Sequence, residues 1–116
     1  MSAAHLTLTL ITAGANLFSG TCAVLHLRAI LPGMAKAGVP ESWLTFPIGT
    51  LKLAGAAGLL LGLRYAPLSA AAAFGLVLFF VCALYTHIRV GDYTPQFFLA
   101  VGFLGLAAST LALAVT

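Results

Sequence analysis

The sequence predicts an all-α polytopic membrane protein, a bundle of four transmembrane helices that forms a single domain over residues 1–116. Three observations predict this fold. First, 62% of the residues are hydrophobic and 6% are charged, whereas a soluble domain carries about 25% charged residues. Second, the mean hydropathy is +1.14. Third, the apolar residues form four stretches of about 20 residues, the length that a helix needs to cross a bilayer. Because lipid cannot satisfy backbone groups, helices suit these stretches better than a barrel.

Turn and anchor residues place the four helices in order along the chain. The first helix ends before the breaker Leu31-Pro32-Gly33, and the only substantial loop follows it. Trp43, a typical interfacial anchor, opens the second helix. Pro67 lies in the first turn of the third helix, where a proline costs no hydrogen bond. The segment 89–95 leads into the fourth. The expected spans are residues 5–27, 43–63, 68–88 and 96–115.

Small residues fill much of these helices, and in lipid they let helices approach each other closely. Gly58 and Gly62 form a GxxxG pattern in the second span, for which tight helix packing is a sufficient explanation. Small bundles of this kind often self-associate, so a homo-oligomer is expected, with the lipid bilayer as the surrounding partner.

Charge and motif content exclude several classes of function. The five Lys and Arg residues are scattered, whereas nucleic-acid binding needs a clustered basic patch, so no nucleic-acid partner is expected. The chain has no HExxH, CxxC, GxSxG or Gly-rich phosphate loop. Cys22 and His26 lie four residues apart, and His26 and His87 are conceivable haem ligands, but we expect no metal site. The two cysteines lie in apolar runs, which suits buried thiols.

Orientation follows from the few cations. Arg28, Lys36 and Arg89 lie in the first and third connections, and Arg64 lies in the second. By the positive-inside rule, the first and third connections face the cytoplasm and both termini face the other side.

Lys52 is the most informative residue, because it lies about 13 Å along the second span among apolar residues. A cation in a transmembrane helix usually faces the interior of the bundle or a wet cavity and has a partner there. No carboxylate lies in the predicted spans, so Lys52 is either neutral or paired with Glu41, Asp92 or an anionic ligand. Snorkelling of its long side chain to the interface is the alternative. The lack of intramembrane acids also argues against a small proton-coupled multidrug exporter.

Further polar residues suggest a pocket near the cytoplasmic side. Asn16 and His26 share a face of the first helix with Ser19, and Tyr85 and His87 end the third helix. We expect Asn16, His26, Lys52, Tyr85 and His87 to bind a ligand, and Arg28 and Arg89 to contact headgroups or anions. Each histidine alone is more often an interfacial or hydrogen-bonded residue than a ligand-binding one. Such a basic pocket would suit a quinone carbonyl, a phospholipid headgroup or another small anion.

An internal sequence repeat suggests that His26 and His87 lie at similar depths in the membrane. At one constant offset, Gly14, Phe18, His26 and Arg28 align with Gly75, Phe79, His87 and Arg89. A duplicated two-helix hairpin explains the repeat, and internal repeats are common in membrane folds. Chance similarity in a sequence rich in Ala, Leu and Gly is the competing explanation.

Several motifs resemble the DoxX-like family of small membrane proteins over most of the chain. They are Leu17-Phe18-Ser19-Gly20 with His26, Pro32-Gly33-Met34, Gly38-Val39-Pro40, Ile48-Gly49-Thr50-Leu51-Lys52-Leu53, Gly58-Leu59-Leu60-Leu61-Gly62-Leu63 and Tyr85-Thr86-His87-Ile88-Arg89-Val90-Gly91-Asp92. The resemblance implies a four-helix bundle in the bacterial cytoplasmic (inner) membrane. Relatives include subunits of thiosulfate:quinone oxidoreductase and of oxidative-stress complexes, and a distant animal branch assists receptor assembly.

At Lys52 this chain differs from the pattern of the family. Relatives often carry a carboxylate where this chain has Lys52, so a role that depends on that acid is in doubt here.

The first hypothesis is a redox-associated subunit that binds a quinone or similar molecule and contacts a membrane redox partner. The second is a non-enzymatic assembly or scaffold protein. The third is a membrane enzyme, such as an isomerase or cyclase, in which Lys52 or a histidine acts as the acid–base group.

Overall fold

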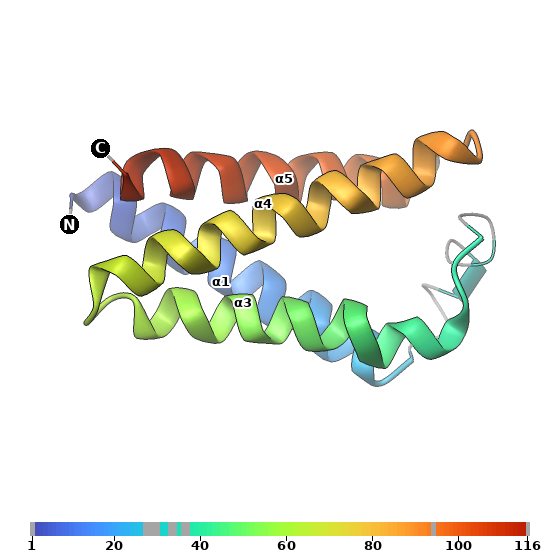
Figure 1. The fold of residues 1–116 in the computed structure, drawn as a ribbon, viewed down its shortest axis with the longest axis horizontal. Coiled ribbons are helices and arrows are strands. Elements are labelled where there is room, and N and C mark those ends of the chain that lie inside the picture. Colours follow the sequence, from blue (N-terminus) through green and yellow to red (C-terminus); the bar gives the residue numbers. More distant parts are fainter. Residues whose placement is uncertain (1, 27–30, 33–34, 36–37, 94, 116) are drawn as a thin grey trace.

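The computed structural model describes residues 2–26, 31–32, 35, 38–93 and 95–115, and these residues contain helices and turns but no strand (Figure 1). A short 3-10 helix, η1, and a wide helical turn, η2, lead directly into the second long helix. The elements are α1 (Ala3–Val24), η1 (Glu41–Leu44), η2 (Thr45–Gly49), α3 (Thr50–Leu61), α4 (Ala66–Arg89) and α5 (Pro95–Ala114). Four of the described segments are long and apolar enough to cross a membrane, and η1, η2 and α3 together form one of them. The predicted all-α four-helix bundle is therefore confirmed.

The first helix is shorter at its C-terminal end than the expected span of residues 5–27. Its first turn is capped by Ser2, whose hydroxyl accepts a hydrogen bond from the backbone N–H of His5 at 3.1 Å. It ends at Val24, and His26 has a positive φ of 53°. A left-handed residue cannot continue a right-handed helix. Residues 27–30 lie outside the described residues.

The second span begins irregularly because of Pro47. Phe46, just before it, is extended at φ −145° and ψ 131°. A proline disfavours helical geometry in the preceding residue, so a regular α-helix starts only at Thr50. The consequence is a bent entrance that places η1 and η2 at the end of the bundle.

The four long helices form a ring in which α1 packs against α3 and α5, and α4 packs against the same two helices. Both ends of the chain lie at one end of the bundle, together with the turn between α3 and α4 (Figure 1). We call this the terminal end. The opposite end, the loop end, carries residues 38–49 and the turn between α4 and α5 (Figure 1).

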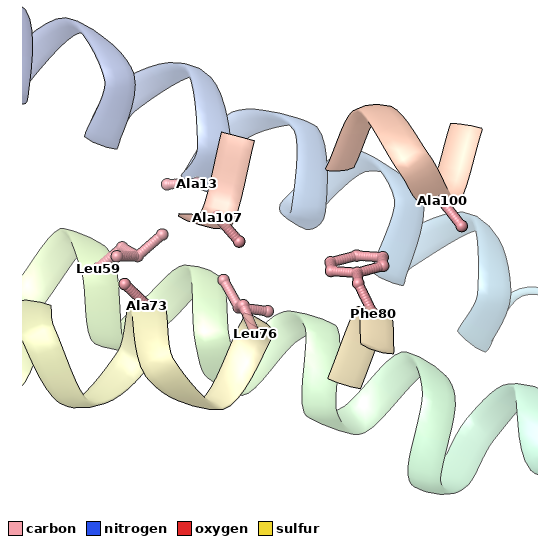
Figure 2. Packing of buried hydrophobic residues seen from close by; sticks show 7 residues of the cluster. All are labelled: Ala13, Leu59, Ala73, Leu76, Phe80, Ala100 and Ala107. Carbon is pink, nitrogen blue, oxygen red and sulfur yellow. The ribbon is translucent and has the colours of Figure 1, made fainter. Parts of the chain in front are cut away.

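The core contains side chains from all four long helices (Figure 2). Its large members are Leu59, Leu76 and Phe80, and alanines fill the remaining positions. The Phe80 ring meets the rings of Phe79 and Phe103 edge to face, with centroids 5.0 and 5.3 Å apart. Many large apolar side chains face outward instead, as expected for helices whose surroundings are lipid.

The GxxxG glycines form the contact between α3 and α4. A Cβ on Gly62 would lie 2.6 Å from the backbone of Ser69, and a Cβ on Gly58 would lie 2.8 Å from the Cβ of Ala72. Both distances are shorter than any ordinary contact of a Cβ atom. The close approach of α4 to α3 therefore depends on the absence of a side chain at these two positions.

Candidate functional site

Lys52 lies in the first turn of α3 and directs its ammonium group into the bundle. Its Nζ donates a hydrogen bond of 2.8 Å to the hydroxyl of Ser19 on α1. The same nitrogen lies 5.7 Å from the ring centroids of Phe79, Phe80 and Phe103. The faces of aromatic rings attract a cation, and the attraction strengthens when water is excluded. The Lys52 ammonium is therefore held by one hydroxyl and three rings.

Gly20 permits this approach of α3 to α1. A Cβ at Gly20 would lie 3.0 Å from Cγ of Leu53 and 3.1 Å from Cβ of Lys52. A larger residue at this position would push the two helices apart and lengthen the contact between Lys52 and Ser19. The small residue of α1 and the cation of α3 thus form one structural unit.

An ammonium group has three N–H donors. Within the described residues, Ser19 is the hydrogen-bond acceptor for one of them, and the two described carboxylates are engaged by histidines. The remaining donors lie among apolar rings, where a hydrogen bond to an acceptor is stronger than in water. The arrangement can therefore donate hydrogen bonds to a carbonyl or an anion in an aromatic environment. We call Lys52, Ser19 and the three phenylalanines the Lys52 site.

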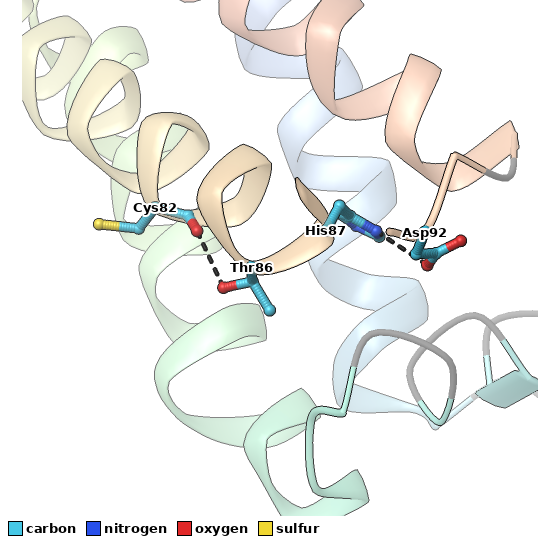
Figure 3. Close-up of polar contacts among 4 residues, drawn as sticks. All are labelled: Cys82, Thr86, His87 and Asp92. Carbon is cyan, nitrogen blue, oxygen red and sulfur yellow. Dashed lines mark hydrogen bonds and ion pairs between the residues drawn. The ribbon is translucent and has the colours of Figure 1, made fainter. Parts of the chain in front are cut away.

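His87 lies within hydrogen-bond distance of a carboxylate at the loop end (Figure 3). Its Nδ1 lies 3.0 Å from Oδ2 of Asp92, and the two side chains are 12% and 2% exposed. The backbone N–H of Asp92 also donates to the carbonyl oxygen of His87 at 2.9 Å. The ring packs edge to face on Phe97, with centroids 6.2 Å apart. This pair joins the end of α4 to the turn that precedes α5.

His26 has a similar but more open environment. Its Nε2 lies 2.9 Å from the hydroxyl of Thr45, and its Nδ1 lies 3.7 Å from Oε2 of Glu41. The His26 and Glu41 side chains are 33% and 61% exposed. Each imidazole thus meets a carboxylate from the connection that follows its helix. Among the described residues, no hydrogen bond or ion pair joins Lys52 to either imidazole, or to Glu41 or Asp92.

The other predicted site residues are dispersed. Asn16 is completely buried on α1, and its Nδ2 donates to the carbonyl oxygen of Thr12 at 2.9 Å. Tyr85 is 66% exposed on the outer surface of α4, and Arg89 is exposed at the end of that helix. Arg28 lies outside the described residues. Among the residues that were described, no three His, Cys, Asp or Glu side chains lie together as a metal site would require.

Sequence reasoning placed Ser19 on the interior face of α1 but did not identify it as the partner of Lys52. It also missed the three phenylalanines. The antiparallel packing of two consecutive helices could have predicted Ser19 as the partner of Lys52, because it brings the end of α1 beside the start of α3. The rings come from α4 and α5, and their convergence depends on tertiary packing that no local pattern encodes.

A sequence model of the DoxX-like family matches residues 7–110. No curated protein and no solved structure matches the chain.

Proposed function

Because the chain belongs to the DoxX-like family, we propose that it is a membrane subunit that binds a quinone or a similar lipid-soluble molecule at the Lys52 site. In this proposal the bound molecule links the protein to a redox partner in the same membrane. The localisation that we propose is the bacterial cytoplasmic membrane.

The observation that supports the proposal is the environment of the Lys52 ammonium. A cation in the middle of a transmembrane helix costs about 2.5–3.5 kcal/mol on insertion scales. Here a neutral hydroxyl and three rings surround it, without a described carboxylate. An ionisable residue inside a membrane is by default a candidate functional residue, and in this proposal the ligand supplies a further hydrogen-bond acceptor for the ammonium.

A quinone has the two features that this site complements. Its carbonyl oxygen can accept a hydrogen bond from the ammonium, and its flat ring can pack on phenylalanine side chains. Lys52, Phe79 and Phe103 are partly exposed at the surface of the bundle, so a molecule dissolved in the bilayer can approach them without crossing water. A phospholipid headgroup would offer a charge but no ring for the aromatic side chains.

The loop end has a supporting role in the proposal. His26 and His87 are already engaged with carboxylates, so we assign them to holding the connections in place, and we assign Arg89 to contacts with anionic headgroups. The two histidines stay secondary candidates for ligand contact, because either ring can turn from its carboxylate when a ligand arrives.

Titration of the purified protein in nanodiscs with decylubiquinone tests the proposal. We expect saturable binding by the wild type, at least tenfold weaker binding by Lys52→Met, and retained binding by Lys52→Arg. Arg64→Met is the matched control, because it removes an exposed cation at the terminal end. Equal binding by wild type and Lys52→Met would contradict the proposal.

The same preparations separate the scaffold hypothesis from this one. A stoichiometric partner that is captured equally by wild type and Lys52→Met, together with no quinone binding by either, would favour an assembly protein.

A further inference from the structure

The interior face of α1 is polar along most of its length. His5, Thr9, Thr12, Asn16 and Ser19 follow each other at alternating spacings of four and three residues, so they form one stripe along the helix. The first four are buried, and Thr9, Thr12 and Asn16 are completely inaccessible. At 1.5 Å per residue, the stripe extends about 21 Å, most of the thickness of a bilayer core. We call these five residues the polar stripe.

Several atoms of this region are buried without a hydrogen-bond partner among the described residues. They are His5 Nε2, Thr9 Oγ1 and Asn16 Oδ1 on the stripe, and Ser69 Oγ at the start of α4. Buried polar groups in native proteins nearly always bond to protein or to ordered water. In a membrane the cost of leaving them unpaired is larger still, because bulk water is absent. Four such atoms in the interior of one small bundle therefore require a bound partner.

The hydrogen bonds that Thr12 and Asn16 make within the bundle leave the amide oxygen of Asn16 available to a bound partner. The hydroxyls of Thr12 and Thr110 lie 3.0 Å apart, and Thr110 donates to the carbonyl oxygen of Leu106 at 2.8 Å. Asn16 uses its amide nitrogen on the carbonyl oxygen of Thr12. The amide oxygen of Asn16 is left to accept a hydrogen bond from another molecule.

The spacing of the stripe suits water. Neighbouring members are separated by about 5 Å along the helix axis. A water molecule that makes two hydrogen bonds of about 2.8 Å bridges a similar distance. Internal waters of this kind typically bond to two to four polar groups.

We propose that the polar stripe binds a file of ordered water molecules, which leads from His5 at the terminal end to Ser19 and the Lys52 ammonium. The file gives the ammonium a route for proton exchange with that side of the membrane. The proposal does not depend on the proposed quinone, because it concerns the protein without a ligand.

Solid-state NMR of the wild-type protein in deuterated lipid bilayers tests this proposal by measuring magnetisation transfer from water to side chains. We expect transfer to Thr9 and Asn16 to be several-fold faster than transfer to Ala73, which is buried in the apolar core. Transfer to Thr9 and Asn16 as slow as to Ala73 would overturn the proposal.

A matched pair of variants tests the direction of the file. Thr9→Val keeps the shape of the side chain and removes its hydroxyl, so transfer to Asn16 should fall at least twofold. Thr21→Val makes the same change at an exposed position, where the hydroxyl bonds to the carbonyl oxygen of Leu17, and transfer to Asn16 should be unchanged. Equal transfer to Asn16 in the two variants would refute entry of water from the terminal end.

Discussion

Lys52 holds its ammonium among three phenylalanine rings, whereas His26 and His87 each lie beside a carboxylate at the loop end. At the scale of single residues, these are two different solutions to placing a polar group in an apolar chain. The histidines are satisfied within the chain and stabilise its turns. The ammonium keeps donors available, which is why we assign the ligand to it.

Replacing Lys52 with methionine should stabilise the folded protein while it removes ligand binding. Methionine has a similar length, and its thioether keeps favourable contacts with the three rings. It also removes the desolvation cost of the cation, which exceeds the loss of the bond to Ser19. We expect the free energy of unfolding to rise by roughly 1–3 kcal/mol. SDS titration followed by the fluorescence of Trp43 measures this change. A loss of stability comparable to a core truncation would show that the cation is structural.

Replacing Asp92 with alanine should destabilise the loop end. The side chain of Asp92 is almost fully buried beside His87, so its loss leaves a buried imidazole nitrogen unpaired, at a cost of about 1.5–3 kcal/mol. Glu41→Ala is the control, because its longer, exposed contact with His26 should be worth at most about 1 kcal/mol. The same SDS titration compares the two variants, and equal effects would contradict the assignment.

At the scale of elements, α3 connects the two interior features of the bundle. One side of α3 approaches α1 at Gly20, where Lys52 reaches Ser19, and another side meets α4 at Gly58 and Gly62. Both contacts depend on glycine, so the position of the cation is fixed by helix packing rather than by the conformation of a loop.

Gly62→Ala should separate α3 from α4, because the added methyl group would collide with the backbone of Ser69. Overpacking of this kind costs about 1–3 kcal/mol. Gly75→Ala is the matched control: nothing lies within 4 Å of the added group, and alanine favours a helix by up to about 1 kcal/mol. Thermal unfolding in detergent should therefore shift in opposite directions for the two variants. If the unfolding temperature fell for Gly75→Ala as well as for Gly62→Ala, the result would contradict this packing.

The sequence predicts elements better than it predicts contacts. Four apolar stretches with Gly and Pro turns were enough to predict the bundle, because membrane length and backbone satisfaction leave few alternatives. The irregular entrance at Phe46 and Pro47 and the left-handed turn at His26 depend on local geometry that hydropathy does not report. The acceptor of Lys52, by contrast, is 33 residues away in sequence, so only the assembled bundle reveals it.

At the scale of the whole molecule, both termini lie at the terminal end, opposite to the loop end (Figure 1). In the orientation that we propose from the positive-inside rule, the loop end faces the cytoplasm and the Lys52 site lies toward that side. The polar stripe would open toward the opposite side of the membrane.

Fusions to the C-terminus test this orientation in a bacterial host. We expect an alkaline phosphatase fusion to be active and a green fluorescent protein fusion to be dark, because the terminal end faces outward. A fluorescent fusion with an inactive phosphatase fusion would mean that the bundle is inverted.

Native mass spectrometry of gently extracted protein tests the Lys52 site most directly, because it reports bound molecules and stoichiometry together. The account predicts that the wild type retains one small molecule with the mass of a quinone, that Arg64→Met retains it as well, and that Lys52→Met has lost it. The same adducts on wild type and Lys52→Met would contradict the claim that this ammonium holds the ligand.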